Sequence, residues 1–347
     1  MSVSVGAQRR VLVAAPLFAD AGLRALADAG VPVLRVSSCD ADGDAMADAM
    51  AQPGVLAVIS RTFPITAAAM DGAHGLRLIV KHGAGVDNID VAAATSRGIP
   101  VLRTAGGNAR SVAELALGLL LAVARRIDQA SAAWRVGQWA RSQDGRELAG
   151  RSVGIAGFGA TGRETATLLA AFGMRVRIWP GRAAPSQAPP AGMSWASSLN
   201  ELLSGSEVLS LHLPLTAHTR GLIGARELAR LPAGAILINV ARGGLIDEGA
   251  LATALNTGHL FGAGLDTTAD EPTPAGSALR AATNLVVTPH LGGSTTAALD
   301  ALALACARHV IAHWRGEPAA WEDCVNPELS PSAPLRMRGA AQTALGR

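Results

Sequence analysis

The sequence predicts an α/β protein with two doubly wound parallel sheets, and three observations indicate this fold class. Short apolar runs alternate with Ala-rich helical stretches through the first hundred residues, and a second series of apolar runs begins after residue 150. A long helical pattern at 109–126 separates the two series. Alternation of strands with helices is typical of parallel sheets, and two such series in 347 residues indicate two domains.

The first series predicts four buried strands and the helices between them. A strand covered on both faces of a parallel sheet is apolar throughout, and each of these runs is short and apolar. The expected strands are Val11–Ala15, Val31–Val36, Val55–Ile59 and Leu76–Val80. The segments Ala21–Ala29 and Asp44–Ala51 are expected to be helices.

The second series predicts six further strands, which would form the second sheet. They are Ser152–Ala156, Arg175–Trp179, Val208–His212, Ala235–Val240, Gly262–Leu265 and Leu285–Val287. The helix expected at 109–126 has Glu114 near its start and Arg125-Arg126 near its end, which suits the helix dipole. A last helical pattern, Thr295–Trp314, could return the chain to the first domain.

Composition excludes several classes of protein. The net charge is only +3, and nearly all positive charge is arginine, with Lys81 the one lysine, so no basic stripe for nucleic acid is expected. The longest apolar helical segment, Leu115–Ala124, is about half of a bilayer span, so no membrane segment is expected. Three scattered cysteines show no metal or disulfide spacing, and we expect a reduced cytoplasmic compartment without a metal site.

A glycine-rich loop, Gly157-Phe-Gly159-Ala160-Thr161-Gly162, lies between an apolar strand and an amphipathic helix. The first glycine permits a tight turn, the second lets the backbone approach a pyrophosphate, and the third lets the helix pack closely on the strand. In this context the loop predicts dinucleotide binding.

The end of the next strand bears on which dinucleotide is bound. An acidic residue there usually holds the ribose 2′-hydroxyl of NAD, but Arg175–Trp179 continues into Pro-Gly-Arg182 without an acid. Arg182 could pair with a 2′-phosphate, so NADP(H) is favoured. Alternatively Arg182 only solvates a loop, and NAD(H) is bound without the usual acid.

Three polar residues in the last third of the chain suggest reduction of a small anionic carbonyl compound. His290 could protonate the carbonyl oxygen as hydride arrives, since imidazole titrates near neutral pH. Glu271 would pair with the other ring nitrogen, and Arg242 could bind a carboxylate through its planar fork of donors. Each residue alone is commonly structural; the prediction rests on their joint occurrence.

The chain closely resembles the D-isomer-specific 2-hydroxyacid dehydrogenases, which include D-3-phosphoglycerate dehydrogenase and glyoxylate/hydroxypyruvate reductase. The resemblance runs from about residue 10 to Asn326-Pro-Glu. It is carried by seven motifs: Gly83-Ala-Gly-Val-Asp-Asn-Ile-Asp90, Gly157–Gly162, Leu211-His-Leu-Pro-Leu-Thr216, Ile238-Asn-Val-Ala-Arg-Gly-Gly-Leu-Ile-Asp247, Gly264-Leu-Asp266, Asp270-Glu-Pro272 and Pro289-His-Leu-Gly-Gly293.

The resemblance implies two Rossmann-like domains with a cleft between them. A flavodoxin-like substrate-binding domain would comprise residues 1–104 and 292–330, and an NAD(P)-binding domain residues 105–291; residues 331–347 would form a flexible tail. The resemblance also implies a homodimer formed through the cofactor domain, to which Ala109–Trp139 could contribute.

The resemblance assigns roles to further residues. It gives Arg242, Glu271 and His290 the catalytic roles argued above, with Arg242 and His290 also contacting substrate. The loop containing Ala84 and Gly85 would bind the substrate carboxylate through backbone N–H groups, and Arg61 would contact a polar substituent. Asp266 would hold the nicotinamide carboxamide, and Pro214 and Thr219 would line the adenosine side. His82 and His212 are interpreted as structural.

Substrate identity stays open at this stage. We favour an NADPH-preferring reductase of small 2-oxoacids such as glyoxylate or hydroxypyruvate. One alternative is an NAD-dependent enzyme of the D-3-phosphoglycerate dehydrogenase type. Another is a non-enzymatic, dinucleotide-sensing scaffold like the family's corepressors, which can keep all three polar residues.

Overall fold

The computed structural model describes residues 9–36, 43–139, 141, 145–181, 187–318 and 320–330. The chain divides into two compact units. Unit 1 comprises Met1–Asn108 and Thr295–Arg347, and unit 2 comprises Ala109–Ser294. The two crossings of the chain therefore lie at 108/109 and 294/295, a few residues beyond the expected 104/105 and 291/292. The expected tail, 331–347, lies outside the described residues.

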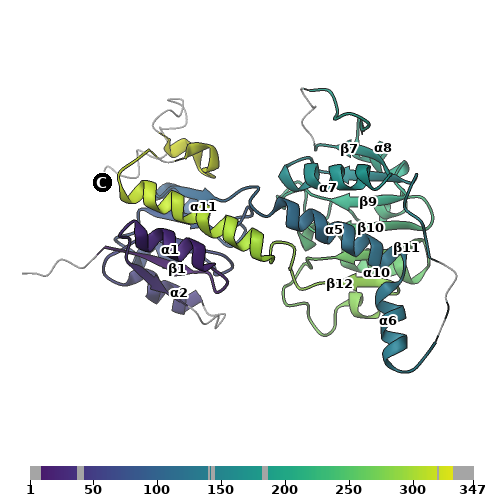
Figure 1. The fold of residues 1–347 in the computed structure, drawn as a ribbon, viewed down its shortest axis with the longest axis horizontal. Helices are drawn as coiled ribbons and strands as arrows, with labels where there is room; N and C mark the ends of the chain where they lie inside the picture. Colours follow the sequence, from purple (N-terminus) through teal and green to yellow (C-terminus); the bar gives the residue numbers. More distant parts are fainter. Residues whose placement is uncertain are drawn as a thin grey trace, which may run out of the picture. The chain divides into compact units, whose positions relative to one another are not determined.

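Unit 1 contains a five-stranded parallel sheet in the order β2-β1-β3-β4-β5. The strands are β1 (Arg10–Ala14), β2 (Val33–Arg35), β3 (Val55–Ser60), β4 (Leu78–Lys81) and β5 (Val101–Arg103). Helices α1 (Asp20–Asp28) and α11 (Thr296–Trp314) lie side by side over one face and share its apolar core (Figure 1). The other face is covered by α2 (Gly43–Ala51), α3 (Ala67–Gly72) and α4 (Val91–Ser96). The helix that returns the chain to the first domain therefore completes its core.

Unit 2 contains a seven-stranded parallel sheet in the order β12-β11-β10-β9-β6-β7-β8. Its strands are β6 (Ser152–Ala156), β7 (Arg175–Trp179), β8 (Ser194–Trp195), β9 (Val208–Leu211), β10 (Ala235–Asn239), β11 (Leu260–Leu265) and β12 (Leu285–Val287). One face packs against α5 (Ala109–Ala124) and α7 (Ala160–Ala171), and the other against α8 (Leu199–Ser204), α9 (Ala225–Leu228) and α10 (Glu248–Asn256). The predicted fold class, two doubly wound parallel sheets, is confirmed.

The helix expected over 109–126 is shorter than predicted. Helix α5 ends at Ala124, and Arg126 adopts a left-handed backbone conformation (φ 50°) before α6 (Ile127–Arg135) begins. The Arg126 guanidinium lies 5.0 Å from the centre of the Phe261 ring and bonds to Gln129, so the turn is fixed by side-chain packing. The basic pair therefore directly follows the last turn of α5 instead of lying within it.

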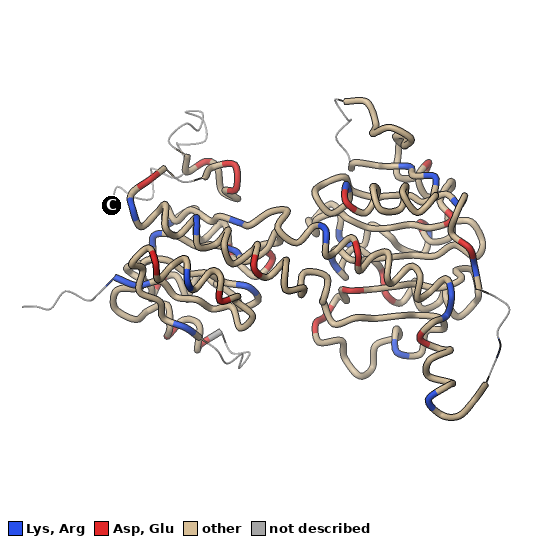
Figure 2. Tube along the Cα trace, in the orientation of Figure 1, with Lys and Arg blue, Asp and Glu red and all other residues tan. Residues whose placement is uncertain are grey.

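Two short strands, β5 and β8, were absent from the sequence prediction. Both lie at a sheet edge. β8 is only two residues long, and the apolar part of β5 is limited to Val101 and Leu102, which follow a proline. Acidic and basic residues are interspersed along both units (Figure 2). Among the described residues no helix is long and apolar enough to cross a bilayer.

Candidate active site

The glycine-rich loop forms the turn from β6 to α7. Gly157 has a positive φ of 98°, and a Cβ there would lie 2.5 Å from the carbonyl oxygen of His212. A Cβ at Gly162 would lie 2.2 Å from the carbonyl oxygen of Gly157. Both positions therefore require glycine for the fold itself, independent of any ligand.

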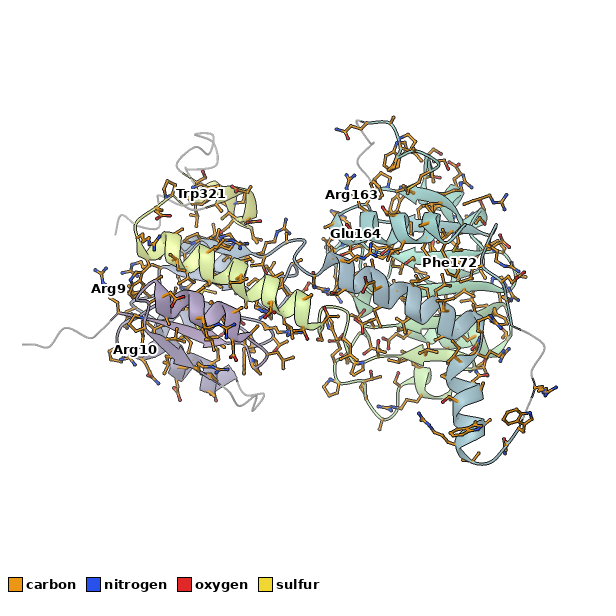
Figure 3. All side chains as sticks on the ribbon, viewed as in Figure 1. Arg9, Arg10, Arg163, Glu164, Phe172 and Trp321 are labelled. Carbon is orange, nitrogen blue, oxygen red and sulfur yellow. The ribbon has the colours of Figure 1, made fainter. Side chains whose placement is uncertain are left out.

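Gly159 differs from the other two glycines because a Cβ there would meet no protein atom within 4 Å. Gly159 is also the N-cap of α7, where no side chain caps the helix. The N–H groups of Ala160, Thr161 and Gly162 at this N-terminus suit a phosphate. Open space at Gly159 and an uncapped helix are the features that a dinucleotide pyrophosphate requires, so the loop fits the predicted cofactor. Arg163 and Glu164, from the start of the same helix, are labelled in Figure 3.

The end of β7 carries no carboxylate among its described residues. The strand finishes with Trp179, followed by Pro180 and by Gly181 with φ 116°. Arg182, the candidate for the 2′-phosphate, lies outside the described residues. The described end of β7 therefore lacks an acidic residue, as the sequence indicated. The pairing of Arg182 with a 2′-phosphate stays a prediction.

Pro214 and Thr219 lie in the loop after β9. The Thr219 hydroxyl donates to the carbonyl oxygen of Pro214 (2.6 Å) and accepts from the amide of Thr216 (2.8 Å). These contacts give Thr219 a role in shaping the loop, and its assignment to adenosine binding stays a prediction.

His290, Glu271 and Arg242 follow three adjacent strands of the unit 2 sheet. Arg242 follows β10, Glu271 follows β11 and His290 follows β12, so all three lie at the same edge, where parallel strands end. His290 Nδ1 lies 2.8 Å from Glu271 Oε2, and both side chains are nearly half exposed. The imidazole is thus oriented by a carboxylate through one nitrogen, as the sequence predicted, and its other nitrogen is left to act on a substrate.

The electrostatics of Glu271 also connect it to Arg242. Partial burial alone would raise the pKa of the Glu271 carboxyl, but the hydrogen bond and charge of His290, the Thr268 amide and the charge of Arg242 together hold it below its usual range. Glu271 is therefore ionised at neutral pH and can stabilise a positive charge on His290.

The fully buried Asn239 fixes the conformation of the backbone that follows β10. Its side chain donates to the carbonyl oxygen of Arg242 (2.9 Å) and accepts from the amide of Ala241 (3.0 Å). A Cβ at Gly243 would overlap Thr268, because the loops after β10 and β11 are in direct contact. The Arg-Gly-Gly sequence therefore lets the Arg242 loop lie against the Glu271 loop.

The Asp266 carboxylate makes three hydrogen bonds to the segment that contains His290. Its carboxylate accepts from the Thr288 hydroxyl (2.6 Å) and from the amides of Leu291 (2.7 Å) and Gly292 (2.8 Å). His290 itself has a left-handed backbone (φ 54°), and its amide donates to the carbonyl oxygen of Asp266 (2.8 Å). Asp266 therefore holds the turn that presents His290, a role that the sequence analysis missed. Contact with the carboxamide stays a prediction.

The predicted substrate residues Arg61, Ala84 and Gly85 form a separate cluster in unit 1. Arg61 follows β3, and burial lowers the pKa of its guanidinium. Ala84 and Gly85 lie in the loop after β4; among the described hydrogen bonds, none is donated by the amides of Ala84, Gly85 or Val86. Three successive amides without an internal acceptor suit a small anion, as predicted for the substrate carboxylate.

His82 is buried, and His212 is partly buried. His82 packs against the Phe18 ring, and burial, followed by the charge of Arg61, lowers its pKa to about 4. His212 Nε2 lies 2.8 Å from Ser210 Oγ, and burial lowers its pKa to about 3. Both imidazoles are therefore neutral at pH 7, in line with the structural interpretation. The described residues contain no group of three His, Cys, Asp or Glu side chains that could hold a metal ion.

Comparisons with known proteins identify one enzyme family. Residues 117–292 match the model of the D-isomer specific 2-hydroxyacid dehydrogenase, NAD binding domain. The chain is 42% identical over 260 residues to a D-3-phosphoglycerate dehydrogenase from Mycobacterium bovis, covering 75% of this chain and 49% of the relative. It is 38% identical over 269 residues to a hydroxypyruvate reductase from Thermotoga maritima, covering 76% of this chain and 86% of the relative. This chain thus spans about half the length of the phosphoglycerate enzyme.

A solved structure is also similar over most of the chain. It is an NADPH-dependent glyoxylate/hydroxypyruvate reductase from Sinorhizobium meliloti in complex with NADP and malonate, 28% identical with a TM-score of 0.79. The similarity covers 92% of this chain and 97% of that one. From the matched domain, the relatives and the cluster of Arg242, Glu271 and His290, we conclude that the chain belongs to the D-isomer-specific 2-hydroxyacid dehydrogenase family.

Proposed function

We propose that the protein transfers hydride between a nicotinamide cofactor and a small 2-oxoacid or D-2-hydroxyacid, and that it acts as an NADPH-preferring reductase of the glyoxylate/hydroxypyruvate type. The observation that carries the proposal is the His290–Glu271 hydrogen bond at 2.8 Å, beside the Arg242 loop and in the same sheet as the dinucleotide loop. Family membership supports an oxidoreductase of 2-hydroxyacids.

In the proposed mechanism Arg242, His290 and Glu271 have different roles. A bound reduced nicotinamide would supply the hydride that the carbonyl carbon of the oxoacid accepts. Arg242 binds the carboxylate or polarises the carbonyl through its fork of N–H donors. His290 gives its proton to the carbonyl oxygen, which becomes the hydroxyl, and Glu271 stabilises the imidazolium before that transfer. In the oxidative direction the same imidazole removes the hydroxyl proton.

The preference for NADPH rests on the end of β7. Pro180 stands where an acid would hold the ribose 2′-hydroxyl of NAD, and Arg182 follows as a partner for a 2′-phosphate. The similar reductase from Sinorhizobium meliloti is NADPH-dependent, which supports this choice.

A second candidate is an NAD-dependent D-3-phosphoglycerate dehydrogenase activity. The 42% identity to the Mycobacterium bovis enzyme favours it, and the half-buried Arg61 would suit a phosphate. A non-enzymatic scaffold is the third possibility, because such a protein can keep all three polar residues.

One assay separates the three functions. Cofactor absorbance is followed with glyoxylate, hydroxypyruvate or phosphohydroxypyruvate, using NADH and NADPH separately. The proposal expects turnover of the first two, faster with NADPH. Preference for phosphohydroxypyruvate with NADH would favour the second candidate. Tight dinucleotide binding without turnover of any oxoacid would indicate the scaffold.

We also propose a homodimer formed through unit 2. Helix α6 has no buried residue, and Trp134 and Trp139 near its end are 65% and 77% exposed. Large exposed apolar side chains that form one contiguous patch mark interaction surfaces, and we propose that these two tryptophans belong to such a patch. Sedimentation should give a dimer for the wild type and a monomer for the Trp134→Glu/Trp139→Glu variant; a monomeric wild type would contradict the proposal.

A further inference from the structure

Lys81, the one lysine of the sequence, lies at the end of β4, directly before the loop predicted to bind the substrate carboxylate. Its side chain is 8% exposed. The ammonium donates to the side-chain oxygen of Asn88 (2.5 Å) and to the carbonyl oxygen of Arg61. One side chain therefore joins the segment that follows β3 to the far end of the loop that follows β4.

Asn88 extends this connection. Its amide nitrogen donates to the carbonyl oxygen of Phe63 (2.5 Å) and to the hydroxyl of Ser60 (3.3 Å). The Ser60 hydroxyl in turn donates to the carbonyl oxygen of Phe63 (3.0 Å). Lys81, Asn88, Ser60 and the carbonyl groups of Arg61 and Phe63 form what we call the Lys81 network.

The start of the loop is fixed separately by β5. The Gly83 amide donates to the Thr104 hydroxyl (2.8 Å), and the Thr104 amide donates to the Gly83 carbonyl oxygen (3.0 Å). Gly83 also has a φ of 133°. Between this anchor and Asn88 lie Ala84, Gly85 and Val86, whose amides donate to no described acceptor. Both ends of the loop are therefore held while its centre keeps its N–H groups for a ligand.

We propose that Lys81 is a positioning residue for substrate recognition: its ammonium fixes the Arg61 backbone and the 83–88 loop relative to each other, so that the Ala84–Val86 amides and Arg61 are pre-arranged for an anionic substrate. The proposal rests on the proposed function, because it assumes that this loop binds a 2-oxoacid carboxylate. Pre-arranged donors bind an anion without the entropic cost of ordering the loop. Lys81 itself does not contact the substrate.

Lysine suits this position for a chemical reason. A compact ammonium offers three donors in different directions on a flexible stem, whereas arginine offers a planar fork. Lys81→Arg should therefore keep part of the network, and Lys81→Met should remove it while keeping the length and apolar character of the stem. Arg24→Met is the matched control, because Arg24 lies exposed on α1 in the same unit and away from the network.

The test measures substrate affinity apart from catalysis and cofactor binding. Lys81→Met should raise the KM for the 2-oxoacid and the Kd for oxamate, a carboxylate analogue, by about tenfold or more, as loss of hydrogen bonds to a charged group implies. The kcat should change by less than about threefold, and NADPH affinity should be unaltered, since the glycine-rich loop lies in unit 2. Lys81→Arg should recover part of the KM, and Arg24→Met should match the wild type.

Hydrogen exchange gives a readout that does not depend on activity. The amide of Ile65 donates to the carbonyl oxygen of Asn88, and the amide of Asp90 donates to the carbonyl oxygen of Ile65, so both should exchange faster in Lys81→Met than in Arg24→Met. Faster exchange together with a raised KM supports the proposal. An unchanged KM in a folded Lys81→Met variant overturns it. A Lys81→Met variant in which kcat falls by the same factor as KM rises, with no recovery of KM in Lys81→Arg, also overturns it, because that result indicates a purely structural role.

If the proposed function itself is wrong, the assays give a different result from failure of the Lys81 proposal. In that case the wild type itself would neither reduce any 2-oxoacid nor bind oxamate, and Lys81 would have no substrate to position.

Discussion

In unit 2 the loops that follow β10, β11 and β12 carry Arg242, Glu271 and His290, whereas in unit 1 the loops that follow β3 and β4 carry Arg61 and the backbone amides of Ala84–Val86. Both sheets are parallel and doubly wound, so both gather their strand ends at one edge. The difference lies in what the buried polar residues do there. Asp266 and Asn239 orient reactive side chains in unit 2, and Lys81 and Asn88 hold a loop in unit 1.

This difference suggests a division of roles between the units. Unit 2 would supply the proton donor, Arg242 and the dinucleotide site, and the 83–88 loop of unit 1 is predicted to bind an anion. Variants of His290 and of the glycine-rich loop should therefore change kcat or cofactor affinity, while variants of the Lys81 network should change substrate KM.

Replacing His290 by glutamine should have the largest effect. Loss of the proton donor should lower kcat by about 10²- to 10⁴-fold, the usual contribution of general acid–base catalysis. NADPH affinity, measured by fluorescence titration, should stay the same because the glycine-rich loop is intact. His74→Gln, on the surface of unit 1, serves as the control and should behave as wild type. A His290→Gln enzyme with normal turnover would remove His290 from the mechanism.

Two alanine variants in the glycine-rich loop should separate folding from cofactor binding. At Gly159 the added Cβ meets no protein atom, so Gly159→Ala should fold normally yet bind NADPH about tenfold or more weakly, equivalent to ~1.4 kcal/mol. At Gly162 the Cβ would strike the Gly157 carbonyl oxygen, so Gly162→Ala should lose about 1–3 kcal/mol of stability. Thermal unfolding and cofactor titration check both. Unchanged affinity in Gly159→Ala would show that pyrophosphate does not lie over this glycine.

Placing an acid at the end of β7 should shift the choice of cofactor. Pro180→Asp offers a carboxylate to the ribose 2′-hydroxyl of NADH and repels the 2′-phosphate of NADPH. The ratio of kcat/KM for NADPH to that for NADH should fall by about tenfold, while the kcat with 2-oxoacid stays similar. A wild type that already prefers NADH would show that the missing acid does not decide the preference.

The smallest effect concerns the stability contribution of Glu271. Its pKa is lowered in the folded protein, so its ionised form stabilises the fold above the ordinary value of 4.5, and this contribution is lost as the pH falls through the lowered folded pKa. Wild type should therefore unfold at a slightly higher temperature than Glu271→Gln at about pH 7, and the gap should shrink as the pH falls below 4.5. A gap that widens in acid would contradict the pairing with His290.

Much of the fold could be predicted because buried parallel strands are continuous apolar runs. The bounds of β6, β7 and β12 agree with the prediction, whereas the two-residue β8 has no such signal. The end of α5 could not be predicted, since the conformation of Arg126 depends on Phe261, a residue distant in sequence.

The candidate site was predictable in its residue types but not in its supporting contacts. The pairing of Glu271 with His290 followed from their chemistry and motifs. The roles of Asp266 and Lys81 did not, because each depends on hydrogen bonds whose partners are set by turn geometry. A polar residue at the end of an apolar strand is the sequence feature that could have identified Asp266 and Lys81.

The most direct test of the central claim is a crystal structure of the protein with NADP and oxamate. We expect the oxamate carboxylate to contact Arg242 or the Ala84–Val86 amides, with His290 Nε2 within hydrogen-bond distance of the oxygen that mimics the substrate carbonyl. Oxamate bound beside the nicotinamide but out of reach of His290 would contradict the account.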